Sequence, residues 1–375
     1  MKAKYMVTSG FLGAGKTTSM IAFSRSIDRR GLGRAAILVD DLGARNIVDA
    51  EQTAASQVMS QSISGDCICY QHENLVDKLH QLIARGADVI FSDIPGCGIG
   101  ALDNVYLQLE RREPGEFQLL PFLCIADPER IPMIMPEQAE LGLPREMRFL
   151  LDAQLAEADL IVLNKIDTIS REQQQRITDF LRQNYPTAQV MAMSALTGEG
   201  VDEVVDLFLG QTAPAVHKEI GYGSEAFVAA EKLMSWYNRR VFLEQRQGRD
   251  LDFNAVIADL FEAIRAGVKR QGGNVPHLKM FASDSPDNSG DYFKASLLGV
   301  DHDIDFTHRL ARPYTALSLV INARAVVPSQ EMAAIVDEAL DAAAEKYGLK
   351  VKTFFMEAFG MMEEGKGNLG RASKY

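Results

Sequence analysis

The strongest constraint on this chain is a nine-residue stretch close to its N-terminus, GFLGAGKTT at residues 10–18. It matches the phosphate-binding loop pattern G-x-x-x-x-G-K-[ST], and it lies between an apolar run at residues 5–7 and a helix-like segment at residues 19–26. Glycines allow the backbone to wrap closely around a phosphate, and the start of the following helix adds a favourable dipole. A Gly-rich turn that carried a lysine by chance would not need this strand–loop–helix context. The chain is therefore predicted to fold around a phosphate group held at the end of a strand.

Two side chains at the end of this loop have specific expected roles. Lys16 is expected to reach the β- and γ-phosphates of a nucleotide, and the Thr17 hydroxyl is expected to ligate Mg²⁺. With the backbone groups around them they make up the predicted phosphate site, which consists of Gly10, Gly13, Ala14, Gly15, Lys16, Thr17 and Thr18.

Carboxylates follow two of the apolar runs downstream. The run at residues 35–39 ends in two aspartates, the second of which is Asp41, and the run at residues 87–92 ends in a D-x-x-G turn from Asp93 to Gly96. In an open α/β sheet, ligands bind at the carboxyl edge of the strands. Asp41 and Asp93 are therefore predicted to hold Mg²⁺ or to orient an attacking water, and the Gly96 N–H is predicted to sense a γ-phosphate.

Two later strand ends indicate which base is bound. The apolar run at residues 159–163 ends in N-K-x-D, and the run at residues 189–193 ends in a Ser-Ala turn. The carboxylate of N-K-x-D can accept hydrogen bonds from guanine N1–H and the 2-amino group, which adenine does not offer in that arrangement. The lysine stem would lie over the purine face, and the alanine N–H of the Ser-Ala turn would meet guanine O6. The predicted guanine-binding residues are Asn164, Lys165, Asp167, Ser194 and Ala195.

Composition bounds the class of protein. A length of 375 residues favours two domains, and a hydrophobic content of 47% is ample for packed cores. The formal charge of −12 argues against nucleic acid as a partner and against a polybasic membrane contact. No apolar run approaches the length of about 18 residues that a membrane span needs, and the N-terminus has no signal-peptide pattern. With only four cysteines, the chain is expected to be cytoplasmic, with reduced thiols.

The alternation of strand and helix patterns predicts the domain organisation. Residues 1–210 are predicted to form an α/β domain, a P-loop NTPase fold with a mostly parallel sheet and helices on both faces. Residues 211–223 are predicted to be a linker. Residues 224–362 are predicted to form a smaller C-terminal α+β domain with an antiparallel sheet, and residues 363–375 are predicted to be a disordered tail.

Three further stretches have element assignments. Residues 44–64 are polar and low in strand signal, which favours a mobile or partly helical segment. Residues 117–125 are predicted to be one strand. Residues 225–246 are predicted to be a helix, followed by a second helix at residues 253–271.

The order of the motifs is similar to that of one group of GTPases. A phosphate loop, an aspartate edge, a C-x-C pair, D-x-x-G, N-K-x-D and S-A-x-T-G-x-G follow one another, and the run from Ser9 to Thr18 is especially close to the CobW form. The first 210 residues thus resemble the CobW-type metal-chaperone GTPases. These are SIMIBI-class P-loop GTPases related to the urease-accessory, hydrogenase-maturation and mutase-chaperone GTPases. The resemblance implies Mg²⁺-dependent GTP hydrolysis, delivery of a metal or cobalamin-related cofactor to a client, slow turnover without a partner, and a homodimer.

Three positions depart from the pattern of that family. N-E-x-G is replaced by D-D-L-G, in which Asp41 keeps the carboxylate, and E-x-S-G is replaced by D-I-P-G, in which Asp93 keeps it. C-x-C-C is replaced by C-I-C-Y, so that Tyr70 stands where the family has its third thiol. The catalytic residues that the resemblance implies are Lys16, Asp41 and Asp93.

The sequence alone leaves open whether the thiols hold a transition metal. In extended backbone Cys67 and Cys69 face the same side, and Cys97 follows the D-x-x-G turn and would add a third soft ligand. Thiolates suit Zn²⁺, Co²⁺ or Ni²⁺, with His72 or Asp66 as a fourth ligand. Alternatively, Cys67 and Cys69 are small buried thiols beside a loop, and Cys97 fills space in a tight turn.

Three functions fit these residues. The first is a GTPase that delivers a metal or metallocofactor to a client metalloprotein or corrinoid protein. The second is a GTPase chaperone or activator of a corrinoid or other cofactor enzyme without a metal cargo of its own, which the missing third thiol favours. The third is a nucleotide-gated adaptor whose C-terminal domain binds a partner. A small-molecule kinase is disfavoured, because most such kinases use ATP.

Overall fold

The structure, a computed structural model, describes residues 2–43, 48–96, 98–136, 144–213, 216–284 and 290–360, except for the side chain of Asp41. Cys97 and the predicted tail at residues 363–375 therefore lie outside the described residues. Contacts divide the chain into two compact units, residues 1–42 with 58–230 and residues 43–57 with 231–375. No helix in the described part of the chain is both long and apolar enough to cross a bilayer.

The first unit is built on an eight-stranded sheet in which every pairing between described strands is parallel. The strand order is β3-β2-β4-β1-β6-β7-β8, with β5 also paired to β1. Its strands are β1 (Lys4–Ser9), β2 (Ala35–Asp41), β3 (Met59–Ser64), β4 (Val89–Asp93), β5 (Gln118–Leu119), β6 (Leu123–Ala126), β7 (Leu160–Leu163) and β8 (Gln189–Ala192).

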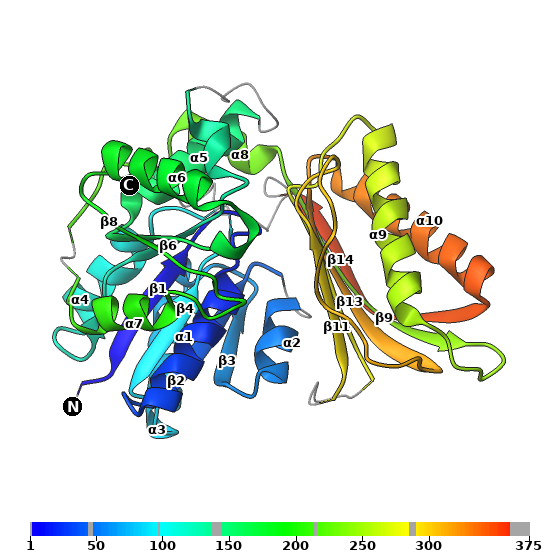
Figure 1. Ribbon diagram of the computed structural model, residues 1–375, viewed down its shortest axis with the longest axis horizontal. Helices are drawn as coiled ribbons and strands as arrows, with labels where there is room; N and C mark the ends of the chain where they lie inside the picture. The colour runs from blue at the N-terminus through cyan, green and yellow to red at the C-terminus, as the bar shows by residue number, and fades with distance from the viewer. Residues whose placement is uncertain are drawn as a thin grey trace. The chain divides into compact units, whose positions relative to one another are not determined.

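Helices cover both faces of this sheet (Figure 1). On one face, Phe23, Phe91 and Phe208 pack edge to face or tilted, joining α1 and α7 to β4. On the other face a cluster including Tyr5 and Leu79 packs α3 and α4 against β1. The helices of this unit are α1 (Lys16–Arg30), α3 (His72–Ala84), α4 (Leu107–Arg112), α5 (Arg145–Glu157), α6 (Arg171–Asn184), α7 (Val201–Leu209) and α8 (Glu225–Lys232), with short turns η1 (Ile68–Tyr70), η2 (Leu102–Tyr106), η3 (Ile131–Ile134) and η4 (Ile166–Thr168).

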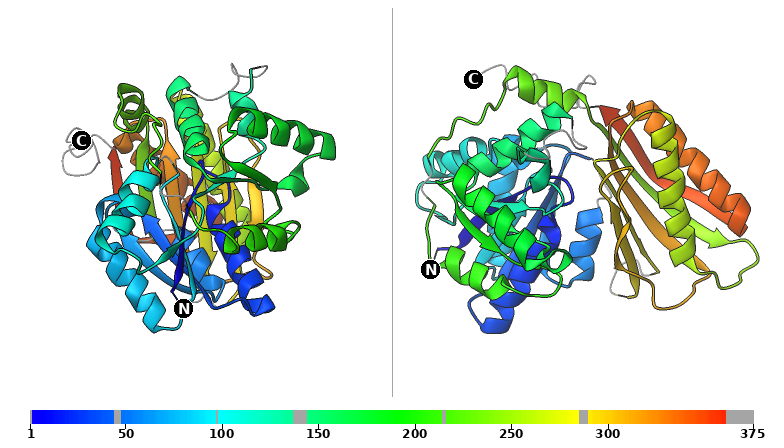
Figure 2. Two further views of the ribbon diagram at one scale, coloured as in Figure 1. Left: turned by 90° about the vertical axis from the view of Figure 1, so that its left-hand side faces the viewer. Right: turned by 45° about the horizontal axis from the view of Figure 1, so that its top comes forward.

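The second unit is an antiparallel sheet with two long helices on one face. Its order is β12-β11-β10-β13-β9-β14. Both Figure 1 and the right view of Figure 2 show α9 and α10 lying along the same face of the sheet. The elements are β9 (Ser235–Gln245), α9 (Phe253–Arg270), β10 (His277–Ser283), β11 (Tyr292–Leu297), β12 (Asp305–His308), β13 (Ala316–Ala325), α10 (Ser329–Tyr347) and β14 (Leu349–Gly360).

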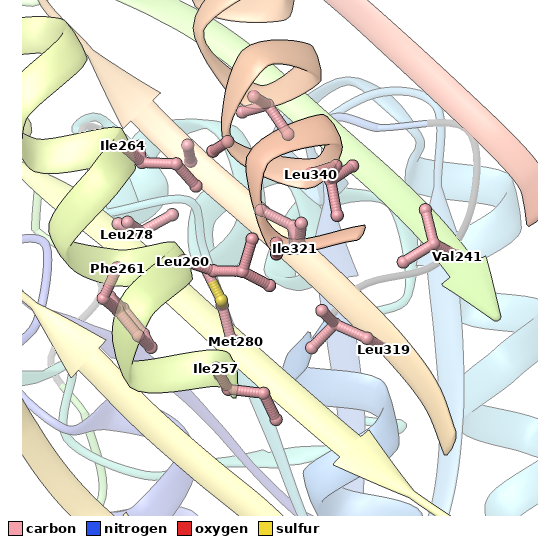
Figure 3. Close-up of a cluster of buried hydrophobic side chains, with 14 of the residues drawn as sticks. Val241, Ile257, Leu260, Phe261, Ile264, Leu278, Met280, Leu319, Ile321 and Leu340 are labelled. Carbon is pink, nitrogen blue, oxygen red and sulfur yellow. The ribbon is translucent and has the colours of Figure 1, made fainter. Parts of the chain in front are cut away.

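The core of the second unit lies between these helices and the sheet. Figure 3 shows Leu260 and Ile264 of α9 and Leu340 of α10 facing Met280 and Ile321 on the central strands β10 and β13. All five side chains are buried. The predicted α+β organisation with a separate antiparallel sheet is therefore confirmed.

A short helix from the N-terminal part of the chain belongs to the second unit. Helix α2 (Val48–Ala55) comes between β2 and β3 in sequence, yet it packs against β10 and β13. Val48 is buried against Phe281 and Val320. Asp49 forms an ion pair of 2.8 Å with Lys279, and Glu51 forms an ion pair with Arg240.

The division by contacts differs from the predicted boundaries in two respects. The break falls between residues 230 and 231 rather than within 211–223, and residues 43–57 belong with the C-terminal part. The first helix of the C-terminal part is also shorter than predicted. Residues 225–246 contain α8 and then β9, which from residue 235 pairs antiparallel with β13 on one side and β14 on the other.

Candidate functional site

The phosphate-binding loop has the backbone that its glycines predict. Gly10, Gly13 and Gly15 all have positive φ, at 140°, 83° and 94°. A Cβ on Gly10 would lie 2.4 Å from the Ile125 carbonyl oxygen, and one on Gly15 would lie 2.5 Å from the Asn164 amide nitrogen. The loop is therefore shaped by close approaches that larger residues would prevent.

The loop ends at the start of helix α1, whose first residue is Lys16. Lys16 Nζ donates a hydrogen bond of 2.8 Å to the Gly10 carbonyl, which folds the side chain back over the loop. Thr17 is buried in the first turn of the helix. N–H groups at a helix start have no partner within the helix and attract anions. The loop thus offers a cradle of backbone donors with an ammonium group above it.

Carboxylates gather beside this loop because β4 is the neighbour of β1. Asp93 ends β4 and pairs in register with Thr8 at the end of β1. Its Oδ1 accepts the backbone N–H of Asp40 at 3.0 Å, and Asp40 Oδ2 in turn accepts the backbone N–H of Ile68 at 3.0 Å. Asp41, which was predicted as the carboxylate of β2, has a side chain outside the described atoms. Asp40 is thus a buried acidic residue at this edge that the sequence analysis did not select.

Gly96 of the D-x-x-G turn lies against the phosphate loop. A Cβ on Gly96 would come within 2.6 Å of Leu12 Cδ2, so only glycine fits there without displacing the loop. Within this turn the Pro95 carbonyl accepts a hydrogen bond of 2.7 Å from the N–H of Gly98, two residues beyond Gly96. The D-x-x-G turn and the phosphate loop are therefore in direct contact.

Asn164 joins the phosphate loop to the Ser-Ala turn. Its side-chain amide donates to the Ala14 carbonyl at 2.9 Å, and its Oδ1 accepts the Ala195 N–H at 2.9 Å. The Ala195 N–H is thus engaged by Asn164 in this structure, whereas the motif predicts that it meets guanine O6. Ser194 is buried, and its Oγ accepts the Thr197 N–H at 3.1 Å.

Lys165 and Asp167 follow Asn164 on the turn after β7. Lys165 has a positive φ of 60°, and its Nζ forms an ion pair of 2.7 Å with Asp127. Asp167 is exposed. Asp127 follows β6 at the same sheet edge and was not selected from sequence, although an aspartate directly after a buried strand is the signal that selected Asp93.

Arg130 is a further residue near the loop that the sequence motifs do not indicate. It is buried with its guanidinium 5.8 Å from the centre of the Phe11 ring, and burial lowers its pKa.

These residues fit a nucleoside triphosphate with Mg²⁺. The loop glycines provide a cradle that a Cβ would fill, and the oxygen atoms of Thr17 and Asp93 are of the kind that Mg²⁺ prefers. Two of the described strand ends, after β1 and β7, are joined through Asn164, so the predicted phosphate and base sites lie at one edge of the sheet.

The surroundings of Cys67 and Cys69 do not favour a transition-metal site. A side-chain hydrogen bond with Cys69, followed by burial, raises the pKa of the Cys67 thiol well above its usual range. Cys67 Sγ also accepts the backbone N–H of Cys69 at 3.4 Å, which opposes this rise in the pKa. Asp66 Oδ1 accepts the Cys67 N–H, and His72 lies 3.6 Å from Glu113 on the neighbouring segment. Among the described residues no group of three or more His, Cys, Asp or Glu side chains is arranged to hold a metal ion. The predicted third thiol, Cys97, lies outside them.

Comparison with solved structures gives several distant likenesses. The hydrogenase maturation factor HypB of Archaeoglobus fulgidus is 16% identical over 56% of this chain and 89% of its own, with a TM-score of 0.36. The Zn(II)-bound YjiA GTPase of E. coli is 14% identical over 90% of this chain and 99% of its own, with a TM-score of 0.34. An LAO/AO transport system kinase is 19% identical over 56% of this chain, with a TM-score of 0.36, and the match spans 59% of that kinase. At these identities and TM-scores the likenesses add nothing to a family assignment.

A family assignment comes from the sequence profile of the CobW/HypB/UreG nucleotide-binding domain. The profile matches residues 4–192, just over half of the chain. The matched region contains β1 to β8 and, except for the Ser-Ala turn, all the strand ends described above. The chain therefore belongs to the CobW/HypB/UreG family of GTP-binding proteins.

Proposed function

We propose that this protein binds GTP with Mg²⁺, hydrolyses it, and couples hydrolysis to the delivery of a metal or cobalamin-related cofactor to a client protein. The observation that carries the nucleotide part is the bridge made by Asn164, which contacts the phosphate loop on one side and the Ser-Ala turn on the other. A single nucleotide can then contact the phosphate loop and the predicted guanine-binding residues at the same time.

Hydrolysis in this proposal depends on positioning and charge stabilisation. Lys16 exchanges its contact with the Gly10 carbonyl for oxygens of the β- and γ-phosphates, and the loop N–H groups hold the same phosphates. Gly96 presents its N–H to the γ-phosphate. Asp41 or Asp93 accepts a hydrogen bond from the attacking water and so orients it. The full site includes a second copy of the chain if, as the resemblance implies, the protein dimerises with the nucleotide at the interface.

Thr17 and Asp93, with Asp41 as the third candidate, would hold the Mg²⁺ ion. When bound there, Mg²⁺ neutralises negative charge on the β- and γ-phosphates. The hydrogen bond that Asp93 Oδ1 accepts from the Asp40 N–H fixes the carboxylate in place before the ion arrives. This prearrangement supports Asp93 as a carboxylate ligand of the ion.

Replacing Asp167 with Ala is expected to remove the preference for guanine. The carboxylate supplies the two charge-assisted hydrogen bonds that distinguish guanine from adenine, so GTP affinity is expected to fall by about 100-fold while ATP affinity stays the same. Competition between fluorescent GTP and unlabelled GTP or ATP measures both. The exposed Asp179→Ala substitution on α6 is the matched control. Unchanged preference for GTP in Asp167→Ala would contradict the role assigned to this residue.

A second function is favoured by the surroundings of Tyr70. Its hydroxyl forms a hydrogen bond with the Tyr222 hydroxyl, and burial raises the pKa of Tyr70, so this side chain stands in the family's third thiol position as a neutral structural group. Cys67 is likewise buried with a raised pKa. These features favour a GTPase chaperone or activator of a corrinoid or other cofactor enzyme without its own metal cargo. A nucleotide-gated adaptor remains the third function that fits the motifs.

Metal titration separates the first two functions. If the protein carries Zn²⁺, Co²⁺ or Ni²⁺ on its thiols, the wild type is expected to bind one of these ions at least about tenfold more tightly than Cys67→Ser and Cys69→Ser, because each substitution removes a soft ligand. A chromogenic chelator in competition gives the affinities, and Cys124→Ser in the buried strand β6 is the control. Equal, weak binding by all four proteins would favour the chaperone without a metal cargo.

The proposal extends to partners and location. GTP and GDP are the small-molecule partners, and a metalloprotein or corrinoid protein is the client. The low cysteine content supports a location in the cytoplasm. A pull-down with protein loaded with a GTP analogue, followed by metal analysis of the eluate, would identify the client and any cargo together.

A further inference from the structure

Helix α5 holds the D-x-x-G segment through a buried glutamine. Gln154 is fully buried, and its side-chain amide nitrogen donates to two carbonyls, those of Gly96 at 3.1 Å and Gly98 at 3.0 Å. A primary amide has two N–H bonds, so it can donate one to each carbonyl. No motif contains Gln154, and the proposed mechanism gives it no role.

The contacts of Gln154 fix the peptide groups around Gly96. The Pro95 carbonyl accepts the Gly98 N–H, which sets the plane of the peptide that carries the Gly96 N–H. Gln154 then holds the next carbonyl, that of Gly96 itself. With Leu12 against its α-carbon, Gly96 is held on three sides. Gln154 also holds the carbonyl of Gly98, the residue whose N–H orients the Pro95–Gly96 peptide, so the direction of the Gly96 N–H depends on Gln154 through Gly98.

A second side chain of α5 holds the other end of the same segment. Glu157, one helical turn after Gln154, accepts the backbone N–H groups of Gly100 at 2.9 Å and Leu102 at 2.8 Å. Burial raises the pKa of this carboxyl to about 7, while the two backbone hydrogen bonds oppose the rise. Positions three apart on a helix lie on the same face. One face of α5 thus donates to the carbonyls at the start of the segment and accepts from the N–H groups at its end.

We infer that Gln154 is a positioning residue of this nucleotide site, which orients the Gly96 peptide for the γ-phosphate and so sets the preference for GTP over GDP. The inference rests on the proposed function. A positioning role for Gln154 differs from a purely structural role in one measurable way. A substitution that only damages the fold weakens the binding of both GTP and GDP, or lowers stability alone. A substitution that misorients the Gly96 N–H weakens the binding only of the nucleotide that carries a γ-phosphate.

The test compares GDP with a non-hydrolysable GTP analogue in the full-length protein. Gln154→Met keeps the unbranched shape and removes both donors, and Gln154→Asn keeps the amide but is one methylene shorter. The ratio of the GDP dissociation constant to that of the GTP analogue is expected to fall about tenfold in Gln154→Met and by less in Gln154→Asn, with GDP affinity within about twofold of wild type. Gln175→Met, on the exposed face of α6, is the matched control and is expected to leave the ratio unchanged.

Amide hydrogen exchange in the wild type gives a second measurement that does not depend on a variant folding. The Gly98 and Gly100 amides are expected to exchange more slowly with the GTP analogue than with GDP. Equal exchange with both nucleotides, or an unchanged affinity ratio in a folded Gln154→Met, would overturn the inference while leaving GTP binding intact. Wild-type protein that binds no guanine nucleotide would instead remove the proposed function, and this inference with it.

Discussion

Replacing Lys16 with Ala is expected to lower the turnover number for GTP by at least about 100-fold. The ammonium group brings a positive charge to the phosphate loop, and charge stabilisers of this kind are worth about 2.7–4 kcal/mol, or about 100- to 1,000-fold in rate. In the structure its Nζ lies 2.8 Å from the Gly10 carbonyl, so it sits directly over the loop. Phosphate release under saturating GTP and Mg²⁺ measures the loss.

The control for this substitution is Lys232→Ala, which removes an exposed lysine at the end of α8. Because the Lys16 ammonium donates to a loop carbonyl, the thermal midpoint of Lys16→Ala should also be recorded, so that lost activity is not confused with lost folding. Turnover within about twofold of wild type in a folded Lys16→Ala protein would refute the assignment of the loop as a catalytic phosphate site.

Replacing Asn164 with Ala is expected to lower the affinities for GTP and for GDP together, by about 10- to 100-fold each. The substitution leaves the buried Ala14 carbonyl and the half-buried Ala195 N–H without their Asn164 partner, and an unsatisfied buried group costs about 1–3 kcal/mol. The affinities for both nucleotides fall because both bind to the phosphate loop and to the base site that Asn164 joins. Fluorescence titration with labelled GTP and GDP measures the two affinities.

The pattern across variants separates Asn164 from its neighbours in the motif. Asp167→Ala is expected to affect the choice of base, and Asn164→Ala the affinity for both guanine nucleotides. Asn184→Ala removes an exposed asparagine that caps the end of α6, and it is the matched control. If Asn164→Ala bound both nucleotides as the wild type does, the bridge between the two loops would have no part in forming the pocket.

The phosphate and base motifs could be predicted from sequence because each combines an apolar strand with a polar turn at its carboxyl end. Neighbouring parallel strands then bring these turns to one edge, as they do for Asp93 beside β1. Asp127 carries the same signal after β6 and could have been found in the same way. Gln154 could not, because it lies in the middle of an ordinary helix pattern and only the folded chain brings it to Gly96.

The partly helical segment expected within residues 44–64 contains α2, but a strand there was missed and two other assignments were wrong, because the pattern of burial was not visible in the sequence. Strand β3 (Met59–Ser64) is polar because it is the edge strand of its sheet, and only Ile63 along it is buried. Strand β9 follows α8 after two residues, and its mixture of aromatic and charged residues suits either a helix or a strand. The predicted strand at residues 117–125 is interrupted, with β5 and β6 separated by three residues. In each case tertiary packing, and not local propensity, decided the element.

The membership of α2 in the second unit means that neither unit is encoded by one uninterrupted stretch of the gene. A fragment expressed from residue 231 onward would keep Arg240 and Lys279 but lack the acidic side chains of Glu51 and Asp49 that neutralise them. It would also expose Phe281 and Val320, which Val48 covers. A truncation series or a domain-swapped chimera of this protein must therefore carry the residues of α2 along with the C-terminal half, supplied either in the same chain or as a separate peptide.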